Sequence, residues 1–195
     1  MIYVICIIIS YLLGSIPFGI IVTKIFKNVN LRTVGSGNIG ATNVMRVGGL
    51  RLAGLVWILD MAKAVAAVLL GGWLVGGAFS IWCGFAAIIG HCFPIWLRFR
   101  GGKGVSALFG ILLAENPLWF VLFGIEWLVV ALVSGYSSLG ALVMFVSMPV
   151  FGFFVGIDVG VALSAISLLC MLRHRENISR LIHGKESKIE WKWKK

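Results

Sequence analysis

Two glycine-rich segments, each carrying a cation, have the residue types that bind phosphate. The first runs from Gly35 to Arg46 and reads Gly-Ser-Gly-Asn-Ile-Gly-Ala-Thr-Asn-Val-Met-Arg. Its glycines leave backbone N–H groups accessible, and Ser36 or Asn38 could cap a helix whose start favours an anion. Asn43 and Arg46 are three residues apart, which predicts that they share one helix face. The alternative interpretation is a connecting loop with a solvated arginine.

The second segment, from His91 to Ser106, places Gly101, Gly102 and Gly104 around Lys103. Three glycines beside a lysine at a helix start predict a nest of N–H groups with a positive charge next to it. The segment is not a P-loop, because Gly104 stands where a Ser or Thr would follow the lysine. The alternative is a basic anchor that binds lipid head groups at the membrane edge.

A third polar cluster, from Arg173 to Glu186, follows the last apolar run of the chain. If it is helical, Arg173, Asn177 and Arg180 lie on one face, with His174 three residues before Asn177. From Lys185 to the end we expect a solvated basic tail in contact with anionic lipid.

Two charges, Asp60 and Lys63, lie inside an apolar run and are three residues apart. Ionisable residues inside a membrane mark functional sites by default, but an adjacent opposite pair can also neutralise itself structurally. Both interpretations stay open, and no role follows for Glu126, which is alone in its apolar run.

The composition requires lipid as the solvent for most of the chain. Of 195 residues, 60% are hydrophobic and only 12% are charged, far from the balance of a soluble domain. The net charge is +10, but no Lys or Arg occurs between Gly104 and Leu172. Such segregation is typical of positive-inside topology and places the basic segments in the cytoplasm. It argues against nucleic-acid binding, which needs a basic soluble face.

A bilayer crossing takes about 20 apolar residues. The long candidates are Ile2 to Ile25, Leu50 to Gly71, Val75 to Leu97, Leu118 to Ser134, Leu139 to Val155 and Ile157 to Leu172. If every basic segment is cytoplasmic, the short run Val105 to Ala114 must also cross. We therefore predict an all-α polytopic bundle of seven transmembrane helices, with the N-terminus outside and the C-terminus cytoplasmic. It forms one domain over residues 1–195, with a basic tail from about residue 184.

The chain resembles the integral-membrane acyl-phosphate:glycerol-3-phosphate acyltransferases of bacteria nearly from end to end. The matching motifs are Gly14-Ser-Ile-Pro-Phe-Gly19, Gly35 to Asn43 with Arg46, Leu59-Asp60-x-x-Lys63, His91 to Val105, Tyr136-Ser-Ser-Leu139 and His174 to Leu181 with Gly184 and Glu186. Departures are Ile39 for a common Pro, Ala64 for Gly, Ser106-Ala107 for Ala-Thr, and Ala141 for Ser. Of these, Ala141 alone touches the suspected site.

This resemblance implies transfer of a fatty acyl group from acyl phosphate to the sn-1 hydroxyl of glycerol 3-phosphate, giving lysophosphatidic acid and phosphate. It also implies a bacterial inner-membrane protein with a cytoplasmic active site, membrane lipids as its surroundings, and no cofactor or metal. We expect catalytic roles for Lys103, His174 and Ser36, and substrate binding by Gly37, Asn38, Asn43, Arg46, Gly101, Gly102, Gly104, Ser138, Arg173 and Asn177.

The first loop and Arg46 would hold one phosphate, and the loop around Lys103 would hold acyl phosphate and stabilise the oxyanion. His174 and Asn177 would orient glycerol 3-phosphate. The proton acceptor is either His174 or the phosphate of the substrate, and we favour the phosphate. An acyl-CoA-dependent acyltransferase and a small membrane transporter remain as alternatives. Neither the acyl chain length nor the oligomeric state follows from the sequence.

Overall fold

The structure is a computed structural model that describes residues 1–189, apart from the side chain of Ala78. Within these residues it contains nine α-helices, two short 3-10 helices and no β-strand, so the predicted all-α class is confirmed. The helices form two compact units, one ending at Pro117 and the other beginning at Leu118.

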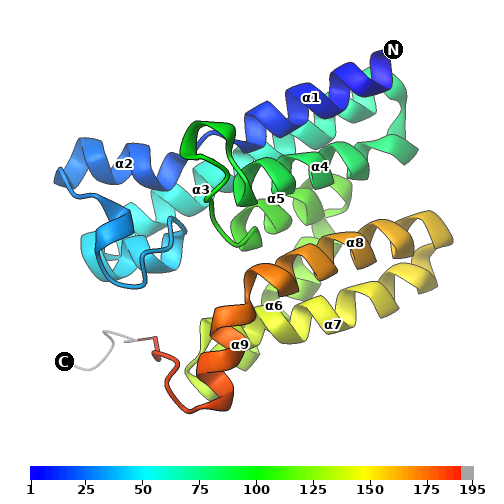
Figure 1. Cartoon of the computed structure of the whole chain (residues 1–195). Coiled ribbons are helices and arrows are strands. Elements are labelled where there is room, and N and C mark those ends of the chain that lie inside the picture. The colour runs from blue at the N-terminus through cyan, green and yellow to red at the C-terminus, as the bar shows by residue number, and fades with distance from the viewer. Residues whose placement is uncertain (190–195) are drawn as a thin grey trace. The chain divides into compact units, whose positions relative to one another are not determined.

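Five helices make up the first unit (Figure 1). They are α1 (Ile2–Gly14), α2 (Phe18–Lys27), α3 (Ala41–Val75), α4 (Gly77–Cys92) and α5 (Val105–Glu115), with 3-10 helices at Leu31–Thr33 and Ile95–Leu97. Helix α3 packs against α1, α4 and α5, and α1 also packs against α4. The helical path breaks between α1 and α2 before Pro17, whose missing N–H cannot continue the ladder. Within α3 it breaks at Gly49 (φ 81°, ψ 177°), next to the predicted span start at Leu50.

Glycines allow α1 and α4 to approach closely. A Cβ atom at Gly14 would lie 2.0 Å from the carbonyl oxygen of Ala87, and one at Gly90 would lie 2.1 Å from that of Tyr11. Small residues at such contacts bring backbones together where lipid supplies no hydrophobic drive for helix association. The glycine content of the sequence therefore has a packing role here.

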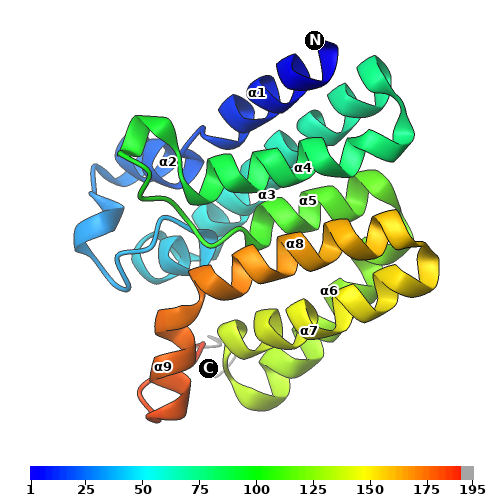
Figure 2. The same cartoon turned by 45° about the vertical axis from the view of Figure 1, so that its right-hand side comes forward.

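The second unit contains α6 (Pro117–Ser134), α7 (Ser137–Val155), α8 (Ile157–Arg173) and α9 (Arg175–Ile182). Helix α7 lies along α8, and its Phe151 ring contacts Trp119 and Phe123 of α6. Helices α8 and α9 meet at His174 with a bend of 60° (Figure 2). The prediction of one continuous helical face from Arg173 to Arg180 is therefore wrong, because the chain turns between them.

Among residues 1–189, five helical segments are long and apolar enough to cross a membrane, or six if α8 and α9 form one bent span. The chain is thus a multi-pass membrane protein. Helix α5 has 11 residues, which gives it a length of about 16 Å, short of a hydrocarbon core of about 30 Å. The predicted seventh crossing stays a prediction.

Candidate active site

Asn43 organises the first loop, residues 28–40 between α2 and α3. Its side chain is buried, and its Nδ2 donates towards the carbonyl oxygens of Leu31 at 3.2 Å, Val34 at 3.0 Å and Asn38 at 2.9 Å. Its Oδ1 accepts the N–H of Ser36 at 2.9 Å. Three acceptors on one side and a donor on the other define the orientation of the amide. The side-chain amide of Asn43, which we expected to bind substrate, therefore holds the backbone of the first loop.

Gly35 is required beside this amide. Its φ of +58° is in the left-handed region, and a Cβ atom would lie only 2.2 Å from Asn43 Oδ1. The predicted capping of α3 by Ser36 or Asn38 is wrong: the N-cap is Gly40, which has no side chain to make a cap hydrogen bond. Ser36 is instead exposed at the tip of the loop, and Asn38 is half-buried.

The start of α3 is the part of the first segment best suited to an anion. Gly37 N–H already donates to the carbonyl of Val34 at 3.0 Å, so it is engaged within the loop. The first N–H groups of a helix, here those of Ala41 and Thr42, have no acceptor within the helix and favour negative charge. Arg46 follows one turn later with an exposed side chain. The N–H groups at the helix start are therefore better placed for an anion than that of Gly37, and the phosphate site itself stays a prediction.

The second loop, residues 93–104 between α4 and α5, bonds to the end of α4 through two of its glycines. The N–H groups of Gly101 and Gly102 donate to the carbonyls of Cys92 and His91, both at 3.0 Å. A Cβ atom at Gly101 would lie 2.2 Å from His91 O. These two N–H groups are therefore engaged within the loop, and substrate binding by Gly101 and Gly102 stays a prediction. These glycines let the loop close onto the end of α4.

Lys103 and Gly104 lead directly into α5. Gly104 is the N-cap of α5 with φ +88°, a conformation that favours glycine, and Lys103 is half-buried beside it. Arg98 and Phe99 in the same loop also have positive φ values of 52° and 59°. For residues other than glycine this conformation costs about 1–2 kcal/mol each. Such strain clusters at functional sites.

Arg32 connects the two loops within the first unit. Its Nη2 donates to the carbonyl of Arg100 at 2.7 Å and lies 3.4 Å from that of Leu97. The two segments predicted to bind phosphate are therefore neighbours. Sequence reasoning missed Arg32, and no local signal distinguishes it from the other cations of its basic run.

The buried ion pair of Asp60 and Lys63 in α3 contacts the chain at the break between α1 and α2. Lys63 Nζ lies 2.7 Å from Asp60 Oδ1 and donates to the carbonyl oxygen of Ile16 at 2.8 Å. Pro17 cannot supply the N–H that would continue the helix, and Lys63 reaches the Ile16 carbonyl beside it. Of the two interpretations left open by the sequence, the geometry supports a pair that neutralises itself within the bundle.

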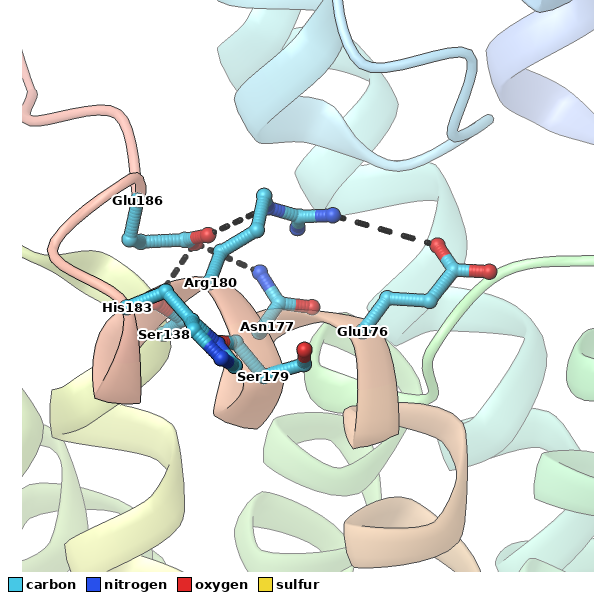
Figure 3. A network of polar contacts seen from close by, with 7 residues as sticks. All are labelled: Ser138, Glu176, Asn177, Ser179, Arg180, His183 and Glu186. Carbon is cyan, nitrogen blue, oxygen red and sulfur yellow. Dashed lines mark hydrogen bonds and ion pairs between the residues drawn. The ribbon is translucent and has the colours of Figure 1, made fainter.

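In the second unit, three side chains converge on the carboxylate of Glu186 (Figure 3). Ser138 Oγ and Asn177 Nδ2 donate to Oε1 at 2.8 Å and 2.6 Å, and Arg180 Nε donates to Oε2 at 2.7 Å. Burial alone would raise the pKa of Glu186, but these hydrogen bonds and the Arg180 charge outweigh it and lower the pKa. Glu186 thus holds Ser138 and Asn177, two expected substrate-binding residues, in place.

The start of the predicted solvated tail is part of this packing. The Glu186 side chain is only 6% exposed. Ile189 N–H donates to the carbonyl of Gly135 at 2.8 Å, and Lys188 Nζ lies 5.6 Å from the centre of the Tyr136 ring. The prediction of a solvated tail is therefore wrong for the Glu186 side chain, whereas Ser187 and Lys188 are exposed. Residues 190–195 of that tail lie outside the described residues.

His174 is buried at the junction of α8 and α9, and its Nδ1 lies 2.7 Å from the carbonyl oxygen of Cys170. Because a carbonyl can only accept, Nδ1 carries the hydrogen, and in the neutral imidazole Nε2 keeps its lone pair. The Phe145 ring packs edge-on against the imidazole at 5.3 Å between ring centres. His174 can therefore accept a hydrogen bond or a proton at Nε2. Arg173, half-buried, ends α8 just before it.

The fold is that of a multi-pass membrane protein. The starts of two of its helices, α3 and α5, each have a cation nearby, Arg46 and Lys103, and such an arrangement favours anions. The family model described as glycerol-3-phosphate acyltransferase matches residues 4–184. Relatives of that name include a Rhizobium etli protein, 48% identical over 183 residues, and an Agrobacterium fabrum protein, 45% identical over 182. Each match covers 93% of this chain and 89% of the relative.

Two crystal structures of PlsY, described as an integral membrane glycerol 3-phosphate acyltransferase, have the same fold. The glycerol 3-phosphate form gives a TM-score of 0.90 at 36% identity, and the lysophosphatidic acid form gives 0.89 at 34%. Both matches cover 96% of this chain and 95% of PlsY. This chain belongs to the integral-membrane glycerol-3-phosphate acyltransferase family.

Proposed function

We propose that this chain transfers a fatty acyl group from acyl phosphate to the sn-1 hydroxyl of glycerol 3-phosphate, giving lysophosphatidic acid and phosphate as the first step of phospholipid synthesis. The observation that carries the proposal is the pair of similar crystal structures, described as glycerol 3-phosphate and lysophosphatidic acid forms. These two molecules differ by one acyl group, so they are the acceptor and the product of a single acylation.

The charge pattern is compatible with acyl phosphate as the donor. From Lys24 to Arg51 the chain has five basic residues and no acidic one, and from Arg98 to Lys103 it has three and none. Acceptor and donor both carry a phosphate, and cations with helix N-termini stabilise such groups. An acyl phosphate is also already activated, so the reaction needs no covalent intermediate on the enzyme.

In the proposed reaction, the hydroxyl oxygen of glycerol 3-phosphate attacks the acyl carbon, and the bond from that carbon to the phosphate oxygen breaks. Arg46 and the start of α3, with Ser36 and Asn38, hold one phosphate. Lys103 and the start of α5 hold the acyl phosphate and stabilise the oxyanion.

The hydroxyl proton goes to phosphate, which leaves as hydrogen phosphate. His174 orients the hydroxyl through Nε2, and Arg173, Asn177 and Ser138 assist in binding the acceptor. Asn43, Gly101 and Gly102 act indirectly, by shaping the loops. In this proposal the whole chain, residues 1–195, is one acyltransferase domain.

We also propose seven crossings, with α5 as the fourth, the N-terminus outside and the C-terminus cytoplasmic. The segregation of basic residues supports this topology, and local thinning of the bilayer would accommodate the short α5. The site would then face the cytoplasm, at the inner membrane of a bacterial cell.

A donor comparison tests the proposal against its alternatives. Purified protein in detergent receives labelled glycerol 3-phosphate with either acyl phosphate or acyl-CoA, and lysophosphatidic acid is measured. We expect product from acyl phosphate alone, and a strong loss in Lys103→Ala. Product from acyl-CoA alone would favour the acyl-CoA-dependent alternative. Uptake of glycerol 3-phosphate into sealed proteoliposomes, without acylation, would favour the transporter.

A further inference from the structure

His91, at the end of α4, has no place among the expected site residues, yet it lies between a buried ion pair and the second loop. Its side chain is only 4% exposed, and its Nδ1 lies 3.5 Å from Asp60 Oδ1. Asp60 is in turn fixed by Lys63 at 2.7 Å. The Asp60 carboxylate of α3 therefore lies next to the Nδ1 side of the imidazole.

The opposite edge of the imidazole packs directly against Gly102. A Cβ atom at Gly102 would lie 2.1 Å from His91 Nε2 and 2.9 Å from both Cδ2 and Cε1. The carbonyl of His91 also accepts the N–H of Gly102 at 3.0 Å. A second tie holds the same end of α4, since Tyr11 Oη donates to the carbonyl of Phe93 at 2.8 Å. The position of the His91 ring therefore determines how closely the backbone of the second loop can approach α4 at Gly102.

We propose that His91 is a positioning residue for Lys103, acting through Gly102. Lys103 is the next residue along the chain, and α5 begins two residues later, so a displaced ring displaces both the cation and the helix start. This inference rests on the proposed function, in which Lys103 holds a substrate phosphate. His91 itself touches no substrate in this account.

The kinetic test compares His91→Ala with Lys103→Ala in the acyl phosphate assay. We expect His91→Ala to raise the KM of the same substrate that Lys103→Ala affects, by about tenfold, the loss that follows when one charge-assisted hydrogen bond weakens. The KM of the other substrate should change much less. His183→Ala is the matched control, because His183 is exposed and bonds locally to the carbonyl of Ser179. A purely structural role would instead lower the amount of active enzyme and leave both KM values alone.

A pair of double variants tests the contact itself. Gly102→Ala should be damaging in the wild-type background, because its Cβ meets the His91 ring, and much less damaging in His91→Ala, where the ring is gone. Gly101→Ala is the matched control: its Cβ meets the backbone oxygen of His91 at 2.2 Å, which no side-chain change removes. His91→Ala should therefore suppress Gly102→Ala and not Gly101→Ala.

The thermal midpoint of each variant is measured alongside activity. If wild-type protein makes no lysophosphatidic acid, the proposed function fails, and the midpoints alone still test the coupling of His91 to Gly102. Equal effects of Gly102→Ala in both backgrounds, or an unchanged KM pattern in His91→Ala, would overturn the proposal. Should His91→Ala not fold, His91→Phe keeps a ring and removes the link to Asp60, and the same KM shift is expected.

Discussion

Replacing Asn43 by aspartate exchanges one NH2 group for an oxygen, yet we expect it to destabilise the protein more than alanine does. Nδ2 lies 2.9 to 3.2 Å from three carbonyl oxygens, and Oδ1 accepts one N–H. Alanine loses these bonds, at about 1 kcal/mol each, or about 2–4 kcal/mol in total. Aspartate keeps the bond from Ser36 but places a buried, unpaired charge against three acceptors, at about 3–5 kcal/mol.

Thermal unfolding of the purified protein in detergent gives the ranking, and proteolysis within residues 28–40 reports the loop directly. The expected order of thermal midpoints is wild type, Asn43→Ala, then Asn43→Asp, with activity lost in both variants. Thr42→Ala is the control, because Thr42 is the adjacent residue and is exposed. If Asn43→Asp were as stable as wild type, or more stable than Asn43→Ala, the amide would not hold the loop as described.

Three further changes test other parts of the site. The pKa of Glu186 is lower in the folded protein than its ordinary value of 4.5. The ionised carboxylate therefore stabilises the fold fully above about pH 4.5, and this stabilisation is lost as the pH falls through the lower pKa of the folded state. Glu186→Gln should lower the thermal midpoint at pH 7 and make the midpoint less dependent on pH in the acid range. His174→Ala should raise the KM for glycerol 3-phosphate about tenfold, the loss of one good hydrogen bond, while appreciable turnover remains at saturation. Arg32→Lys keeps the charge but loses the guanidinium that reaches the Arg100 carbonyl, and should lower kcat/KM about fivefold.

Each of these changes has an outcome that contradicts its reasoning. Glu186→Gln with an unchanged acid profile would mean that another group governs the loss of stability. A collapse of turnover in His174→Ala by about 10² to 10⁴, with KM unchanged, would identify the imidazole as the base. Arg51→Lys is the control for Arg32→Lys, since Arg51 is exposed and lies outside both loops; equal effects would indicate a general charge effect.

The membrane helices could be predicted because lipid imposes a strong and local requirement. Every span must be apolar along its length, so the pattern of residues marks it without knowledge of its neighbours. The predicted span from Leu50 begins beside the break observed at Gly49. Crossings are harder to count where a run is short, as at Val105–Glu115, because length alone does not decide its depth.

Roles within the loops could be predicted only in outline, because they depend on contacts between distant residues. A glycine can be needed for its accessible N–H group or for its missing Cβ, and the sequence around Gly102 does not distinguish these two roles. The structure shows that the missing Cβ matters, because the His91 ring occupies the space that a Cβ at Gly102 would need. Glu186 looked like part of a solvated basic tail, and only the convergence of Ser138, Asn177 and Arg180 shows why its carboxylate is buried.

The proposed function depends most on acyl phosphate and glycerol 3-phosphate being the two substrates of one transfer. The direct measurement is the stoichiometry of product formation by purified protein, with lysophosphatidic acid and phosphate quantified in the same reaction. We predict one phosphate for each 1-acyl product, and neither product when glycerol 3-phosphate is omitted. Phosphate released without acylated glycerol 3-phosphate, or acylation supported only by acyl-CoA, would contradict the account.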